Sequence, residues 1–144
     1  MKTLLITGGA GFIGANFIPY FLENNSDIRV VNVDALTYAG NIKNLAEVNS
    51  NYRYIFEKGD ICNRKFIDEV FRKYQISGVI HFAAESHVDN SIKNPDAFIQ
   101  TNINGTFNVL DAAKNYWMHG PNQYKEEYVN SRFHHISTDE VFGT

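Results

Sequence analysis

The chain has 144 residues, of which 44% are hydrophobic and 20% are charged, and its formal net charge at pH 7 is −3. This length is that of one ordinary domain with a buried core. The mildly acidic balance argues against nucleic acid or an anionic membrane surface as the main partner, because both select basic proteins. No segment has the pattern of a membrane span or a signal peptide, and the single cysteine, Cys62, fits a reducing compartment, so we expect a cytoplasmic protein.

Strands and helices are expected to alternate along the chain. Short apolar runs predict five strands, at residues 2–7, 28–33, within 52–61, 77–84 and 132–138. Apolar residues at helical spacing predict helices at residues 12–23, 63–74 and 95–118, with a shorter helical segment at 41–48. Residues 119–131 are polar and rich in turn formers, and we expect an exposed loop there.

Single residues refine these helices. Pro19 removes a backbone hydrogen bond, so the first helix is expected to kink or to end early. Asn63 and Asn94 stand where a helix cap is expected, and Pro95 suits the first position of a helix. Gly105 either weakens the long helix or allows a neighbouring element to approach it closely.

A glycine-rich segment, GGAGFIG at residues 8–14, joins the first strand to the first helix. Glycine at Gly8, Gly11 and Gly14 permits a tight turn, a close approach to a pyrophosphate and close packing of the helix on the strand. The first N–H groups of the helix then face the phosphates. Asp34 lies 20 residues after Gly14, at the end of the second strand, where a carboxylate accepts hydrogen bonds from ribose hydroxyls and repels a 2′-phosphate. The expected cofactor is NAD rather than NADP, and a helix-cap or loop role is the alternative for Asp34.

Together these patterns predict an α/β fold, a doubly wound parallel sheet of the Rossmann type, with an NAD-binding domain over residues 1–144. Ligands bind such sheets beyond the carboxyl ends of the strands. At the end of the third strand, Asp60 is expected to accept from the adenine amino group and Ile61 to pack on the ring. A simple cap for the helix that begins near Asn63 is the alternative for Asp60.

The sequence resembles the extended short-chain dehydrogenase/reductases over its whole length. The resemblance rests on TGGAGFIG with its downstream acidic residue, HFAAESHVD at residues 81–89 and HHISTDEVFGT at residues 134–144. Three segments resemble the members that dehydrate nucleotide sugars: DALTYAGN at residues 34–41, AAESHVDNSI at residues 83–92, and HHISTDEVFGT. This similarity implies a lyase that acts on dTDP-glucose in deoxysugar biosynthesis.

The resemblance also implies an NAD-binding set that extends from the glycine turn to the long helix. Its members at the pyrophosphate and the adenosine ribose are Phe12, Ile13, Asp34, Leu36 and Thr37. Its members at the fourth strand and on the long helix are Phe82, Ala83, Ala84, Ser86 and Thr101. Ser86 is also implied to lie near the sugar of the substrate.

The implied reaction is an elimination of water from the glucose ring, with Thr138, Asp139 and Glu140 as the catalytic residues. Transient oxidation at C4 by NAD acidifies the C5 proton, which Glu140 removes, while protonated Asp139 donates to the departing C6 hydroxyl. The hydride then returns to C6, and Thr138 hydrogen-bonds the C4 oxygen. Two adjacent carboxyl groups suit this division of roles, because both ionising together is unfavourable. A solvated acidic turn is the alternative.

The general base of the family is a tyrosine followed four residues later by a lysine. Tyr54 and Lys58 have this spacing but lie on a predicted strand, where residues four apart do not meet as they do on a helix. We expect the functional pair, and a sugar-nucleotide domain, beyond Thr144. The chain is therefore interpreted as the N-terminal part of a longer enzyme, with a sheet incomplete at its C-terminal side and no dehydratase activity by itself.

Two other functions stay open. An epimerase or decarboxylase of the same family would keep the NAD site but would not need the Asp139–Glu140 pair. A non-catalytic dinucleotide-binding module would explain the missing tyrosine and lysine. A metal site is not expected, because the adjacent His134 and His135 point to opposite faces of a strand. The resemblance alone implies a homodimer through the long helix.

Overall fold

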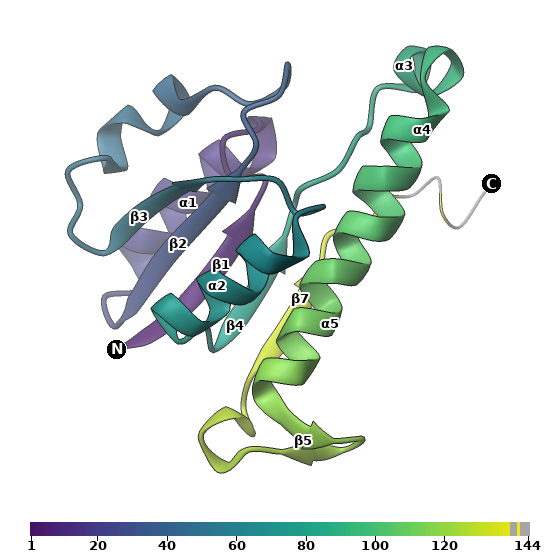
Figure 1. The fold of residues 1–144 in the computed structure, drawn as a ribbon. Coiled ribbons are helices and arrows are strands. Elements are labelled where there is room, and N and C mark those ends of the chain that lie inside the picture. Colours follow the sequence, from purple (N-terminus) through teal and green to yellow (C-terminus); the bar gives the residue numbers. More distant parts are fainter. Residues whose placement is uncertain (139–140, 142–144) are drawn as a thin grey trace.

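A computed structural model describes residues 1–138 and Val141, and shows a parallel sheet with helices on both faces (Figure 1). The strands of this sheet are β1 (Lys2–Thr7), β2 (Ile28–Asp34), β3 (Tyr54–Lys58), β4 (Gly78–His81) and β7 (Arg132–His135). Their order is β3-β2-β1-β4-β7, and every neighbouring pair is parallel. The predicted doubly wound parallel sheet is confirmed.

The helices follow the strands in alternation. They are α1 (Phe12–Asn24), η1 (Ile42–Val48), α2 (Arg64–Tyr74), α3 (Val88–Lys93), α4 (Pro95–Phe98), η2 (Ile99–Gly105) and α5 (Thr106–Trp117). The last three form one long helix, and its middle part, η2, has π-helical hydrogen bonding. In the part of the chain that the structure describes, no helix is long and apolar enough to cross a membrane.

Two hydrophobic clusters lie on opposite faces of the sheet. On one face, Val31, Val33 and Val79 of the strands pack with side chains of α2 and α5 that include Phe71 and Val109. On the other face, the strands pack with α1 and η1, through Ile6, Val30, Ile18, Leu22 and Leu45. Because both faces are covered over β1 and β2, these strands have consecutive buried residues without alternation, which is why their positions were predictable, whereas β7 at the edge of the sheet has no buried residue.

The long helix is held close to the loop that follows β3. A Cβ atom at Gly105 would lie 2.6 Å from Cδ1 of Ile61, so a larger residue there would force the two elements apart. This confirms that Gly105 allows a close approach. Of the two alternatives for Pro19, an early end of the first helix is wrong, since α1 continues through Pro19 to Asn24, while a kink at Pro19 stays a prediction.

Elements with little buried surface were not predicted correctly. α3 has no buried residue, so it carries no apolar periodicity. The expected loop at residues 119–131 contains an antiparallel hairpin of β5 (Met118–Gly120) and β6 (Gln123–Tyr124), followed by the short helix η3 (Glu126–Tyr128). The fourth and fifth strands are also shorter than predicted, because their last residues leave the sheet to form the site.

The two asparagines expected as helix caps behave differently. The side chain of Asn63 accepts the N–H of Phe66 at 3.1 Å, which confirms it as the cap of α2. Asn94 makes no such side-chain bond, and instead its backbone N–H bonds to the carbonyl of Asn90 at the end of α3. Asn94 is therefore the N-cap residue of α4, as predicted, but its side chain makes no cap bond, and Pro95 occupies the first turn of α4 as predicted.

These caps provide a matched test of the fold. Asn63→Ala should lower the free energy of unfolding by about 1 kcal/mol, because one N–H of the first turn of α2 loses its acceptor. Asn94→Ala should change it by less than half as much. Urea denaturation of both variants measures the difference, and equal losses would contradict the assignment of the caps.

Candidate functional site

The glycine turn brings the ends of β1 and β4 close together. Gly8 has φ +71°, and a Cβ atom there would lie 2.5 Å from the backbone nitrogen of Ala83. A Cβ atom at Gly14 would lie 2.5 Å from the Cα atom of Gly9. Both positions therefore require glycine for the reasons that the sequence predicts, a tight turn and close packing of α1.

The amino end of α1 is open to a ligand. Gly11 is the cap residue and offers no side chain to the first turn, and the first bond of the helix runs from Ala15 N–H to Gly11 O at 2.9 Å. The N–H groups before Ala15 have no partner within the helix. Phe12 and Ile13, the predicted pyrophosphate contacts, are 84% and 60% exposed. An anion fits this end of the helix by hydrogen bonding and by the helix dipole.

Asp34 connects the end of β2 to the glycine turn. One carboxylate oxygen accepts the N–H of Ala10 at 2.9 Å, and the other accepts the N–H of Leu36 at 2.8 Å. A carboxylate has about four acceptor positions, so two are left for ribose hydroxyls. Leu36 adopts a left-handed conformation, with φ 53°, beside this carboxylate, while Thr37 is exposed on the loop that follows.

The sequence analysis missed Asn32, which supports the same turn from β2. Its Oδ1 accepts the N–H of Gly9 at 3.1 Å, and its Nδ2 donates to the hydroxyl of Tyr54 at 3.0 Å. Asn32 is fully buried. An asparagine inside the apolar strand VVNVD was the available signal, because a buried amide needs such partners.

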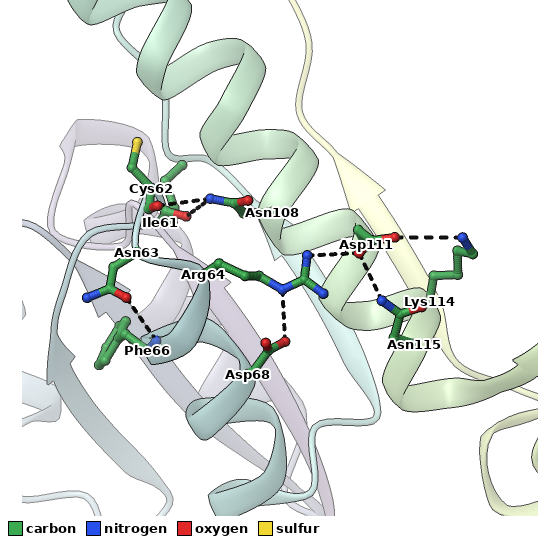
Figure 2. A network of polar contacts seen from close by, with 10 residues as sticks. All are labelled: Ile61, Cys62, Asn63, Arg64, Phe66, Asp68, Asn108, Asp111, Lys114 and Asn115. Atoms are coloured by element: carbon green, nitrogen blue, oxygen red, sulfur yellow. Dashed lines mark hydrogen bonds and ion pairs between the residues drawn. The ribbon is translucent and has the colours of Figure 1, made fainter.

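The segment after β3 is fixed to α5 by polar contacts (Figure 2). The amide of Asn108 donates to the carbonyls of Ile61 and Cys62 at 3.2 and 3.0 Å. The guanidinium of Arg64 on α2 forms ion pairs with Asp68 of the same helix at 3.0 Å and with Asp111 of α5 at 2.8 Å. The second ion pair links α2 to α5.

Asp60 and Ile61, the predicted adenine contacts, therefore stand in a constrained loop. Asp60 is exposed and accepts the N–H of Cys62 at 2.8 Å. Ile61 is 5% exposed and packs in the core, so its contact with a ring stays a prediction. Burial and neighbouring Asp60 raise the pKa of the Cys62 thiol to about 11, which keeps it protonated at neutral pH.

The loop after β4 carries the predicted nicotinamide-side residues. Phe82 and Ala83 are half-buried beside the glycine turn, and Ala84 and Ser86 are exposed. Thr101 lies half-buried on η2. The structure thus gathers the glycine turn and the loops after β2, β3 and β4 at the carboxyl edge of the sheet, as the fold predicts.

A buried histidine links β1, β4 and the long helix. His81 contacts the Thr7 hydroxyl through Nδ1 at 2.6 Å and the Thr106 hydroxyl through Nε2 at 3.0 Å. Burial, with a smaller contribution from His135, lowers the pKa of His81 to about 4. Thr7 Oγ1 also accepts the N–H of Ala83 at 3.4 Å, which favours donation of its own proton to Nδ1 and of the Nε2 proton to Thr106. The imidazole is neutral and structural.

The catalytic residues expected after the fifth strand are only partly described. Thr138 is exposed beyond the end of β7, whereas Asp139 and Glu140 lie outside the described residues. Tyr54 and Lys58 lie on β3, as expected, and burial raises the pKa of the Tyr54 hydroxyl, which is the wrong direction for a base. Within the described ranges, no three His, Cys, Asp or Glu side chains are grouped as a metal would need.

The family described as GDP-mannose 4,6 dehydratase matches residues 5–144. The chain belongs to this family. It is 54% identical over 143 residues to a dTDP-glucose 4,6-dehydratase of Neisseria meningitidis, a match that covers 99% of this chain and 39% of that protein. The chain thus spans about two fifths of the length of the curated relatives it matches.

Solved structures agree with this placement. The crystal structure of a dTDP-glucose 4,6-dehydratase from Bacillus anthracis in complex with NAD has a TM-score of 0.80 and 34% identity, and covers 100% of this chain and 40% of that chain. A UDP-glucose 4-epimerase from Thermotoga maritima with UDP-glucose has a TM-score of 0.70 and 30% identity, over 80% of this chain and 35% of that chain. The Rossmann-type fold and the resemblance to nucleotide-sugar dehydratases are confirmed.

The lowered pKa of His81 predicts a stability that depends on pH. Between its ordinary value of 6.5 and about 4, the unfolded chain binds the proton more readily, so stability falls as the pH falls through this range. The whole shift corresponds to about 3 kcal/mol. Glu57 and Asp111 titrate below their ordinary values of 4.5 and 3.8, because Lys73 and Arg64 donate hydrogen bonds to them. Between pH 6.5 and 5, the change in stability with pH should therefore come from His81 and not from these two carboxylates.

Urea denaturation at several pH values, with His81→Gln and the exposed His119→Gln as variants, measures this dependence. The loss of stability between pH 6.5 and 5 should persist in His119→Gln and largely vanish in His81→Gln. Equal slopes in the two variants would show that His81 is not its source.

Proposed function

We propose that this chain is the NAD-binding part of a dTDP-glucose 4,6-dehydratase, a lyase of deoxysugar biosynthesis. The observation that carries the proposal is the sequence Thr138-Asp139-Glu140, which begins three residues after the end of β7 in a parallel sheet of the Rossmann type. The 54% identity to the Neisseria dehydratase, over nearly the whole chain, supports it. The proposed substrate is dTDP-glucose and the product dTDP-4-keto-6-deoxyglucose.

The proposed cofactor is NAD, because the residues at the carboxyl edge fit it. The glycine turn leaves no room for Cβ atoms at Gly8 and Gly14, so the turn is tight and α1 packs closely on the sheet, as in dinucleotide-binding turns. Gly11 leaves the first turn of α1 without a side-chain cap, open to the phosphates. Asp34 retains acceptor positions for two ribose hydroxyls and would repel a 2′-phosphate. The Bacillus dehydratase of similar fold was crystallised with NAD.

The elimination needs an acid and a base in opposite protonation states. NAD, when bound, supplies the oxidation at C4 and the later reduction at C6. In this proposal ionised Glu140 removes the C5 proton, and protonated Asp139 delivers a proton to the leaving C6 hydroxyl, which departs as water. When C6 is later reduced, Glu140 returns a proton to C5, which completes the product. Thr138 hydrogen-bonds the C4 oxygen. Proton transfer by a positioned group typically contributes about 10²–10⁴ in rate.

We further propose that the complete protein is a cytoplasmic homodimer that uses the long helix. An exposed apolar stripe supports this surface: Ile99, Ile103, Phe107 and Leu110 are 50%, 62%, 61% and 48% exposed. These four residues recur at helical spacing along η2 and α5. Continuous apolar surface of this kind is typical of contacts between subunits.

Two alternatives are tested with the same experiments. The similarity to the Thermotoga 4-epimerase keeps an epimerase in consideration, because that protein shares the fold at 30% identity. An epimerase would yield a 4-epimer with no deoxy-sugar. A non-catalytic NAD-binding module would yield no product and would lack a Tyr-x-x-x-Lys segment in the rest of its gene.

The dehydratase proposal predicts a specific product and a specific defect. The complete protein, incubated with dTDP-glucose and separately with UDP-glucose, should form a 4-keto-6-deoxy product chiefly from dTDP-glucose. Asp139→Asn should slow elimination by about 10²–10⁴-fold, while oxidation at C4 continues. Product analysis and the absorbance of reduced cofactor measure the two steps, and unchanged elimination would remove Asp139 from the mechanism.

The dimer proposal predicts that a charge on the apolar stripe dissociates the subunits. Ile103→Glu should convert a dimer into a monomer in sedimentation velocity, because the carboxylate would have to be buried without a partner. Lys65→Glu changes the charge of an exposed residue on α2 and should leave the dimer intact. A monomeric wild-type protein would contradict the proposal.

A further inference from the structure

Both ends of the loop that follows β2 are hydrogen-bonded to the glycine turn. Asp34 at its start accepts the N–H of Ala10 at 2.9 Å, and Asn41 at its end donates its N–H to the Ala10 carbonyl at 3.0 Å. The tip is closed by a bond from Gly40 N–H to Thr37 O at 3.1 Å. Tyr38 therefore stands at the tip of a short loop that projects from the glycine turn.

Tyr38 joins this loop to the one that follows β4. Its hydroxyl donates to Oε2 of Glu85 at 2.9 Å, and its ring centroid lies 6.1 Å from that of His87. In the sheet, β1 lies between β2 and β4, and all three strands are parallel. A contact between the loops that extend from β2 and β4 therefore crosses the carboxyl end of β1, where the glycine turn lies.

Glu85, on the loop that follows β4, is fixed to the long helix. Oδ1 of Asn102 accepts the N–H of Glu85 at 2.8 Å, and Nδ2 of Asn102 donates to the Glu85 carbonyl at 2.8 Å. The two bonds hold the Glu85 backbone in one position against η2.

We propose that Tyr38, Glu85 and Asn102 form a strap across the dinucleotide site, which positions the bound cofactor and slows its release. The proposal rests on the proposed NAD-binding function. The residues next to the strap are those predicted to touch the cofactor: Thr37 precedes Tyr38, Ala84 and Ser86 flank Glu85, and Thr101 precedes Asn102. The strap thus connects the adenosine side of the site to the nicotinamide side over the glycine turn.

The exposure of the strap suits a part that opens and closes. Tyr38 is 61% exposed, so breaking its bond to Glu85 disturbs no core packing. The anchors are bonds of the Asp34 carboxylate and the Asn102 amide to backbone groups, and none of them uses the Tyr38 hydroxyl or the Glu85 carboxylate, so they stay in place when the Tyr38–Glu85 bond breaks. The Tyr38–Glu85 hydrogen bond must therefore break before the dinucleotide can enter or leave across this edge.

Release of the cofactor tests the strap directly. The complete protein, loaded with NADH, is mixed rapidly with a large excess of NAD, and the loss of bound NADH fluorescence gives the release rate. Tyr38→Phe and Glu85→Ala should each raise this rate about five-fold, the effect of one lost hydrogen bond. The double variant should release no faster than either single variant, and Glu85→Gln, which keeps an acceptor for the hydroxyl, should stay near the wild type.

Two matched controls separate the strap from general damage. Tyr20→Phe removes the hydroxyl of another exposed tyrosine, 66% exposed on α1, and should leave the release rate unchanged. Asn102→Ala should accelerate release, whereas Asn104→Ala, on the same helix and bonded only locally to Gln100, should not.

The possible failures are distinguishable. Equal release rates for the wild type and Tyr38→Phe would overturn the strap, as would additive effects in the double variant, since independent residues do not share one bond. A protein that binds neither NAD nor NADH would overturn the proposed function together with the strap. Normal binding with unchanged release would overturn the strap alone.

Discussion

The carboxylate of Asp34 accepts the N–H of Ala10 at 2.9 Å and the N–H of Leu36 at 2.8 Å, and thereby ties the carboxyl end of β2 to the glycine turn. Because Asp34 is only 8% exposed, these backbone donors are what make its burial tolerable. The turn, the entry to α1 and the loop that carries Tyr38 all start from this contact. Removal of the carboxylate would leave two N–H groups without their acceptor and release both the turn and the loop.

A second constraint holds the other half of the site. The long helix is brought against the loop after β3 by Gly105 and by the amide of Asn108, and against the loop after β4 by Asn102. His81, kept neutral by burial, adds a link from β1 through β4 to Thr106. Hydrogen bonds of the Asn102, Asn108 and His81 side chains therefore hold the loops at the carboxyl edge of the sheet in defined positions, and such preorganisation lowers the cost of binding.

Rules that use only neighbouring residues predicted the structural features that depend only on neighbouring residues. The central strands β1 and β2 are largely apolar because both faces are covered there, and Gly8 and Gly14 are required by geometry that a few residues define. Asn63 and Asn94 mark the limit of such rules, because both occupy an N-cap position but only the side chain of Asn63 bonds to the first turn of its helix. The hairpin β5–β6 and helix α3 were missed because they bury too little to create a pattern.

The sequence by itself determined the fold class and the position of the glycine turn, and it singled out Asp34 as the proposed ribose acceptor, since these depend on residues near one another or on the period of burial. Only the tertiary structure decided which side chains meet across the edge of the sheet. Tyr38 and Glu85 are 47 residues apart, and Thr7 and His81 are 74 apart. Such pairs follow from strand order and loop conformation, which no local pattern encodes, so the strap was visible only once the strands were in place.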